Sequence, residues 1–256
     1  MKTRFTILTV ILLVAMLWSA GCRKYPRIVG NNQVEIENRT LVSFDRIKNE
    51  GTFNVYIRHD SVHRASIEAE SNLIPHIRTL VEGNTLVIDT RENLKNNYSM
   101  NVYVTAPIIR GAALSGSGYI LLDSLFTDYM EVEISGSGEI EGYMDADMSL
   151  ARISGSGNIY LDCYTQSLDA RISGSGNLDI VGFGDNNKLT ISGSGQIRSY
   201  NFEQNHCEAR ISGSGDMFLN VMESLKVDIS GSGSIYYIGD PALNISITGS
   251  GNVYKQ

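Results

Sequence analysis

The four histidines are the first residues to consider for metal chemistry. His59 and His63 are four residues apart, a spacing that brings two metal ligands together on a helix. The sequence around them alternates as a strand does, and a strand would separate the two side chains by about 13 Å. His76 and His206 stand alone. The sequence therefore predicts no metal site and no cofactor.

Serine is so abundant that a Ser, His and Asp set could be chosen almost anywhere, so no catalytic triad is predicted. An enzyme that cleaves polysaccharides would need clustered carboxylates and a basic residue in a groove. Asp162, Asp179 and Arg198 come nearest to such a cluster, and they are too few to define an active site. We therefore expect no catalytic residues and a protein that is not an enzyme.

A motif rich in Ser and Gly recurs eight times and could be mistaken for a phosphate-binding loop. No copy has the Lys followed by Ser or Thr, or the following helix, that a P-loop requires. A calcium-binding β-roll would need an Asp at a fixed position in every copy. The residue after the motif is instead Tyr119, Glu139, Asn158, Asn177, Gln196, Asp216, Ser234 and Asn252. Neither nucleotide nor calcium binding is expected.

The spacing of this motif defines a repeat protein. Seven copies of Ser-Gly-Ser-Gly and one of Thr-Gly-Ser-Gly follow at intervals of 20, 19, 19, 19, 20, 18 and 18 residues. They begin at Ser115, Ser135, Ser154, Ser173, Ser192, Ser212, Ser230 and Thr248. Units this short cannot bury an apolar face alone, so neighbouring units must stack.

Apolar residues flank each motif at alternating positions, which is typical of strands with one buried face. Each repeat is therefore expected to be a strand, a Gly-rich corner, a second strand and a variable return. This predicts an all-β fold, a parallel β-helix or β-solenoid with coils of 18–20 residues. At about 4.8 Å per coil, eight coils make a rod about 40 Å long. The glycines are expected to supply positive φ angles at the corner, and the serines to bond its unpaired polar groups.

The N-terminus has the pattern of an export signal. Lys2 and Arg4 precede an apolar run that ends in small residues and Cys22, so residues 1–21 are predicted to be a signal peptide. The cysteine at this place resembles the lipobox of bacterial lipoproteins, although Ser19 stands where that pattern favours Leu. The resemblance implies acylation of Cys22 and a protein held by its lipid at the cell envelope, at the outer membrane in particular.

Residues 22–37 are expected to form the lipid-anchored tether and residues 38–256 the solenoid. Residues 110–256 hold the regular repeats. Residues 38–109 contain strand patterns at 52–58, 64–70, 86–89 and 100–105, with a short helix or loop at 72–80. They are expected to form irregular first coils that cap the rod, with a separate small β domain as the alternative. Cys163 and Cys207 lie two coils apart, at least ~9.6 Å, which is too far for a disulfide.

The chain also resembles a known family. The resemblance rests on the lipobox-like start, the segment Phe44-Asp45-Arg46-Ile47 and the serial Ile-Ser-Gly-Ser-Gly copies. Together these look like the head GIN domain family of auto-transporter adhesins, common in Bacteroidetes-type bacteria, over about residues 40–256. The resemblance implies a right-handed β-helix similar to pectin-lyase-like folds, a role in adhesion and no established catalytic residues.

Two outward-facing columns are candidate binding surfaces. One holds Arg152, Arg171 and Arg210, and the other holds Tyr160, Phe218, Tyr236 and Tyr254. Aromatic rings can stack on sugars or anchor a protein partner. They also suit strand surfaces, where neighbours in a ladder support one another. Both interpretations stay open at this point.

The sequence thus favours a non-catalytic envelope lipoprotein that acts as an adhesin or ligand-binding solenoid, with a glycan or protein ligand. A structural or assembly protein of the envelope is the alternative, and a polysaccharide-active β-helix enzyme is a weaker one. The last coil lacks an obvious cap, so self-association through the C-terminal coil is expected. Loss of Lys2 and Arg4 with the signal peptide takes the net charge from −7 to −9, which disfavours nucleic acid as a partner.

Overall fold

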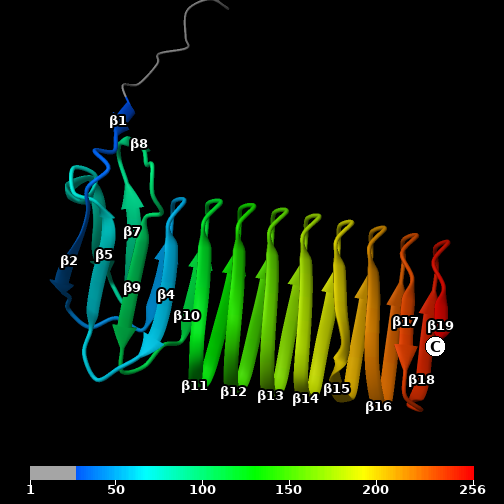
Figure 1. Ribbon diagram of the computed structural model, residues 1–256. Helices are drawn as coiled ribbons and strands as arrows, with labels where there is room; N and C mark the ends of the chain where they lie inside the picture. Colours follow the sequence, from blue (N-terminus) through cyan, green and yellow to red (C-terminus); the bar gives the residue numbers. More distant parts are fainter. Residues whose placement is uncertain (1–26) are drawn as a thin grey trace, which may run out of the picture.

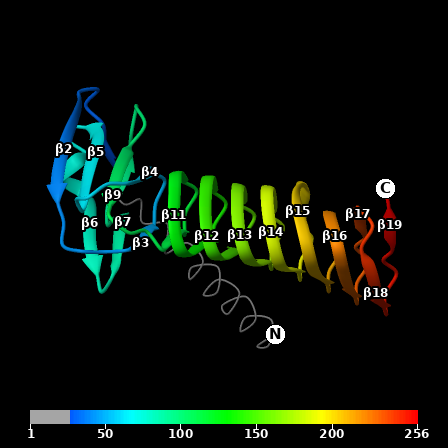
Figure 2. The same cartoon turned by 90° about the horizontal axis from the view of Figure 1, so that it is seen from below.

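Long, bent strands stacked side by side make up most of the chain in the computed structural model, which describes residues 27–256 (Figures 1 and 2). Cys22 and the predicted signal peptide lie outside the described residues. Each of these strands runs through nearly a whole coil: β11 (Tyr119–Ile134), β12 (Glu139–Ile153), β13 (Asn158–Ile172), β14 (Asn177–Ile191), β15 (Gln196–Ile211) and β16 (Asp216–Ile229). The predicted parallel β-solenoid is confirmed. Among residues 27–256 no helix is long and apolar enough to cross a membrane.

Neighbouring coils pair in parallel, with like residues in register. Ile140 pairs with Ile159, which pairs with Leu178, and all three are buried. The residue before each motif forms a second interior column, in which Ile153 pairs with Ile172. The last part of each repeat, expected to be a variable connection, is instead continuous strand. Its backbone stays paired with the neighbouring coil as far as the next motif.

The Ser-Gly-Ser-Gly corners lie in a row along the upper edge of the rod in Figure 1. The expectation that their glycines have positive φ is wrong. Positive φ among the glycines of residues 27–256 occurs only at Gly83, Gly142, Gly182 and Gly239, all outside the motif. The corner requires glycine because successive corners stack on one another with almost no space between them.

From the second copy on, the first glycine of each motif lies against the carbonyl oxygen of the first glycine one coil earlier, and in the first copy Gly116 lies against the Gly51 oxygen. A Cβ built on Gly174 would lie well under 3.0 Å from the Gly155 oxygen, closer than real Cβ atoms approach. The second glycine packs on the interior as well: a Cβ on Gly176 would strike the Gly157 oxygen and the Ile153 side chain. The Ile column and the glycine column therefore fit each other.

Backbone groups bond through the corner, so the serines matter less than expected. The N–H of Ser173 donates to the Ile153 oxygen at 2.8 Å, and the N–H of Ser175 donates to the Gly155 oxygen at 3.0 Å. The Ser173 hydroxyl is a distant second donor to the same Ile153 oxygen, at 3.5 Å. The corner is thus a stacked, hydrogen-bonded layer rather than a loop.

The last full coil consists of β17 (Ile235–Ile238) and β18 (Ala242–Ile247), which stack on β16, and β19 (Val253–Lys255) stacks on β17 as the start of the next coil. Leu243, Ile245 and Ile247 continue the buried columns of β16, yet they are 40–47% exposed because no described strand stacks on their outer side. The expected self-association through this coil stays a prediction.

The opposite end has a different topology. β3 (Arg46–Asn49) and β4 (Asn54–His59) form the coil on which β10 (Gly111–Leu114) and β11 stack. β7 (Thr85–Thr90) and β9 (Asn101–Ala106) stack in parallel on the outer side of β3 and β4. The coil of β3 and β4 therefore lies between the outer coil of β7 and β9 and the first regular coil. The chain forms β3 and β4 first, then the outer coil, and then crosses to the other side of β3 and β4, where the regular repeats begin.

Antiparallel strands cover this outer coil. β5 (Arg64–Glu70) pairs with β9, β6 (Ile77–Glu82) pairs with β7, and β2 (Val34–Thr40) covers β5. The four strand patterns of this region correspond to β4, β5, β7 and β9, whereas β6 gave no clear pattern. The stretch left as helix or loop begins with a 3-10 turn at Ile74–His76. β1 (Arg27–Val29) pairs with β8 (Asn93–Lys95), so β1 and β2 extend the ordered cap into residues expected to be tether.

Glu70 joins the first described residues to the cap. Its buried carboxylate accepts hydrogen bonds from the N–H groups of Asn32 and Asn97, both at 2.7 Å, and from the Asn97 amide at 3.0 Å. Burial acts to raise the pKa of Glu70, but the hydrogen bonds from Asn97 and Asn32 outweigh it and lower the pKa. A Cβ on Gly30 would overlap this carboxylate, so the position requires glycine. We call this contact of Gly30, Asn32 and Asn97 with Glu70 the Glu70 closure.

Replacement of a corner glycine should destabilise the rod severely. We expect Gly174→Ala to lower the free energy of unfolding by about 3 kcal/mol, because neither backbone can move without breaking the stack. Ser173→Ala is the matched control and should cost less than about 0.5 kcal/mol. Urea unfolding measures both. Equal stabilities of the two variants would contradict the close-contact explanation.

The Glu70 closure should depend on pH. A lowered pKa in the folded state means that the charged carboxylate stabilises the fold above its unfolded pKa, about 4.3, and that this contribution is lost on acidification. Glu70→Gln should therefore melt below the wild type near neutral pH, with a difference that narrows once the pH falls below about 4.3 and is lost as it passes through the lower pKa of the folded state. Thermal melts over a pH series test this. A difference that stays constant at all pH values would show that the charge is not responsible.

Candidate binding surface

The aromatic column lies on the outer face of the last coils, but its four predicted residues do not form one group. Phe218 pairs with Tyr236 and Tyr236 with Tyr254, and their rings stack at 5.1 and 5.2 Å with interplanar angles of 9° and 19°. We call these three residues the aromatic ladder. Tyr160 is separated from it by Asp179 and Arg198, which occupy the same column in the two coils between.

Stacking within the ladder limits what it can bind. The two faces of Tyr236 are covered by Phe218 and Tyr254, so its ring edge is what it offers to a partner. Tyr254 is 43% exposed and is covered by the ladder on one face only. The ladder therefore presents a row of ring edges and one end face.

The coil of β15 breaks the regular register beside the ladder. Ser199 pairs with Leu219 and Glu203 pairs with Asn220, so three residues of β15 face no partner on β16. They are Tyr200, Asn201 and Phe202. Phe202 fills the interior and is fully buried, while Asn201 is exposed. Such a β-bulge re-aims side chains, and bulges are common next to functional sites.

This bulge produces a hollow on the outer face. Its volume is about 500 Å³, and its lining includes Asp179, Val181, Arg198, Tyr200, Asn201 and Phe218. We call it the bulge groove. Tyr200 meets Phe218 in a T-shaped arrangement, with ring centroids 5.7 Å apart and an interplanar angle of 76°. The groove therefore adjoins the first ring of the ladder.

The three arginines of the other column are all paired with carboxylates. Arg152 binds Glu131 at 2.6 Å, Arg171 binds Asp169 at 2.7 Å, and Arg210 binds Glu208 at 2.6 Å. Asp169 and Glu208 stand two residues before their arginines in the same coil, and Glu131 stands in the column of these two carboxylates, one coil before Arg152, so all three carboxylates lie beside the arginines. Their charges compensate one another, and the column offers no free basic stripe.

The nearest approach to an enzymatic cluster is also dispersed. Arg198 binds Asp179 at 3.1 Å in the bulge groove. Asp162 pairs with Val181 in the strand register and is not part of the lining. Residues 27–256 contain no group of three or more His, Cys, Asp or Glu that could hold a metal ion.

The two remaining cysteines lie in the interior as separate thiols. Cys163 and Cys207 are free and buried, and burial raises the pKa of each thiol to about 12. A thiol with so high a pKa is a poor nucleophile at neutral pH. These cysteines are packing residues.

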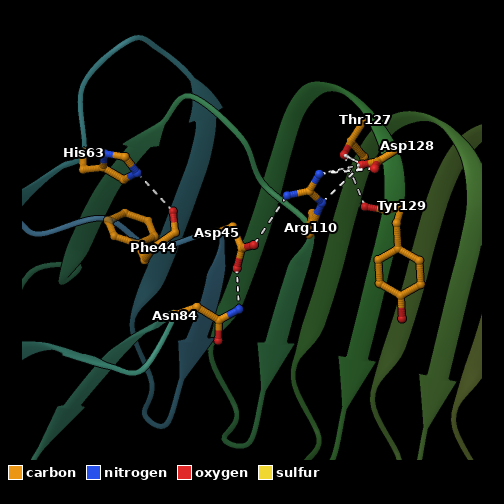
Figure 3. A network of polar contacts seen from close by, with 8 residues as sticks. All are labelled: Phe44, Asp45, His63, Asn84, Arg110, Thr127, Asp128 and Tyr129. Carbon is orange, nitrogen blue, oxygen red and sulfur yellow. Dashed lines mark hydrogen bonds and ion pairs between the residues drawn. The ribbon is translucent and has the colours of Figure 1, made fainter.

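The segment that begins at Phe44 forms the joint between cap and rod (Figure 3). The buried Phe44 ring meets His63 edge-on at 5.1 Å, and the His63 Nε2 lies 3.1 Å from the Phe44 oxygen. Asp45 lies 3.7 Å from Arg110, which also binds Asp128 at 3.1 Å. The hydrogen bond from Arg110 lowers the pKa of Asp128. This network is structural, since Arg110 bridges Asp45, directly before β3, and Asp128 in β11.

A second exposed aromatic cluster was not anticipated from the sequence. Phe126, Tyr143 and Tyr164 lie in tilted contact, 5.8 and 5.9 Å apart, on three successive coils. The bulge groove was not anticipated either, although the sequence carries a signal for it: the interval of 20 residues from Ser192 is followed by one of 18. When two neighbouring coils differ in length, their strands cannot pair residue for residue around the whole coil, and the longer coil must bulge.

These observations define the class of protein: a capped, parallel β-solenoid that carries its distinctive side chains on an outer face. The chain belongs to the family described as "Putative auto-transporter adhesin, head GIN domain", whose model matches residues 43–241. No curated protein matches the chain.

Solved structures of proteins from Parabacteroides and Bacteroides share the fold. A "putative lipid binding protein" from Parabacteroides distasonis is 26% identical, with a TM-score of 0.84 over 90% of this chain and 100% of that one. A "putative adhesin" from Parabacteroides merdae is 20% identical, with a TM-score of 0.85 over 90% and 99% of the two chains. A "putative adhesin" from Bacteroides fragilis is 23% identical, with a TM-score of 0.70 over 90% and 100%.

Proposed function

We propose that this protein is a non-catalytic adhesin of the cell envelope that binds its ligand through the outer face of its last coils. The observation that carries the proposal is the position of the aromatic ladder. Arg27, where the described chain begins, lies at the cap, and β16 to β19 lie at the opposite end of the rod (Figure 1). An anchor that precedes Arg27 would hold the ladder and the bulge groove away from the membrane.

The anchor is part of the proposal and is supported by the lipobox-like sequence at Cys22. Acylation of Cys22 would leave a short segment between the lipid and β1, so the cap would stand near the membrane and the rod would project from it. The family description as an adhesin supports an exported protein at the cell surface. Membership of a fold family is weak evidence for function, so the proposal depends on the exposed rings.

Aromatic residues provide contact area at low cost in conformational entropy, which is why they dominate binding hot spots. The ladder holds its rings in fixed positions by stacking, so little further ordering is needed on binding. Because Arg152, Arg171 and Arg210 are already paired with carboxylates, their column gives no reason to expect an anionic ligand. We infer that Phe218, Tyr236 and Tyr254 form the contact surface. The three paired arginines lie on earlier coils and take no part in it.

Removal of the distal rings should abolish attachment. We expect cells that express the full chain with Tyr236→Ala and Tyr254→Ala to attach at least about tenfold less to mucin-coated and matrix-coated surfaces, equivalent to about 1.4 kcal/mol. The matched control is Tyr143→Ala with Tyr164→Ala, which removes two touching rings from the second cluster. Both variants must melt like the wild type.

Protease treatment of intact cells belongs to the same experiment. The proposal expects the rod to be digested without disruption of the outer membrane. A rod cleaved only after disruption would contradict a surface adhesin and favour a structural protein within the envelope. Attachment that survives loss of both distal rings would contradict the assignment of the contact surface.

A further inference from the structure

The bulge groove differs from the aromatic ladder in the chemistry that it offers, and it suggests what kind of ligand is bound. We propose that the groove is a saccharide-binding site that holds one segment of a neutral glycan chain, with Tyr200 as the stacking platform. This inference rests on the proposed adhesin function and names its ligand class.

The first support is a ring face in the right place. The ladder rings cover one another, with interplanar angles of 9° and 19°, whereas Tyr200 and Phe218 are nearly perpendicular at 76°. Tyr200 is partly exposed and lines the hollow, and a perpendicular neighbour covers at most one of its two ring faces. The negative face of an aromatic ring attracts weakly positive C–H groups, which one side of a sugar ring provides.

The second support is the set of polar groups around the platform. Asp179 accepts from Arg198 Nη1 at 3.1 and 3.2 Å, and Arg198 Nη2 donates to the Gln196 side chain at 2.7 Å. Arg198 and Asn201 are exposed. The groove thus offers a carboxylate, a guanidinium and an amide, held partly by one another, to neighbouring sugar hydroxyls. Few, well-placed polar groups beside aromatic surface are typical of small-ligand sites.

Charge and shape decide between ligand classes. The Arg198 charge is compensated by Asp179, so the groove has no unpaired cation for a phosphate or a uronic acid. A lipid chain would need an enclosed apolar cavity, whereas this hollow is bordered by exposed polar side chains. Its volume of about 500 Å³ lies within the range of small-ligand sites and lets a longer chain continue along the face.

Titration calorimetry and saturation-transfer NMR on the mature chain test the proposal. The probes are neutral glucan, mannan and galactan oligosaccharides, a polyuronate and phosphatidylcholine vesicles. We expect at least one neutral oligosaccharide to bind with a Kd of about 1 mM or tighter. Tyr200→Ala should weaken it at least about tenfold, while Tyr200→Phe, which keeps the ring, should retain most of it.

Tyr160→Ala is the matched control, because Tyr160 is an exposed ring on the same face outside the groove. It should leave saccharide binding unchanged. Asp179→Asn leaves Arg198 without its partner and should create affinity for the polyuronate. Failure of every neutral probe to bind, binding that Tyr200→Ala does not affect, or Tyr200-dependent binding of vesicles would each overturn the proposal.

The two proposals fail in different ways. Cell attachment that is lost in the Tyr236 and Tyr254 double variant, together with no Tyr200-dependent binding of any neutral oligosaccharide in calorimetry, would reject the saccharide site and keep the adhesin. Attachment that neither change affects would reject the adhesin surface, while the calorimetry would still decide whether the groove binds sugar.

Discussion

The close stacking of glycine on glycine at the corners is the constraint on which the rest of the structure depends. Each coil turns there with its backbone against the backbone of its neighbour, and a single Cβ would not fit. Because hydrogen bonds run through the corner, the coils keep one register on both sides of it. The interior Ile column and the parallel pairing of the long strands both follow from this fixed register.

A frame with this rigid period leaves its outward positions free for other uses. Side chains at equivalent positions meet their counterparts one coil away, which turns single residues into columns. The rings of one column stack on one another, whereas the arginines of the other pair with carboxylates of the column beside it. The groove arises where the period changes, since β15 carries residues that β16 has no place to pair.

Periodicity explains which features the sequence could predict. The β-solenoid, the buried columns and the separation of Cys163 from Cys207 all follow from counting residues between motifs. The reason for the corner glycines was predicted wrongly. A positive φ and a close approach between coils both require glycine, so the sequence cannot distinguish the two causes. The sequence could not show that β3 and β4 lie between the outer coil and the regular coils, because residues 38–109 contain no repeat to align. Ring stacking and the bulge groove required side-chain geometry, although the unequal intervals around Ser212 marked the place.

Hydrogen exchange of the corner amides in the central coils tests the central claim most directly. Ser-Gly sequences usually form flexible linkers, whose amides would exchange freely. Here the N–H groups of Ser154, Ser156, Ser173 and Ser175 donate to the preceding coil, and the account predicts that they exchange as slowly as the strands on either side. Fast exchange at these amides, beside protected strands, would show that the corners are ordinary loops and would contradict the account.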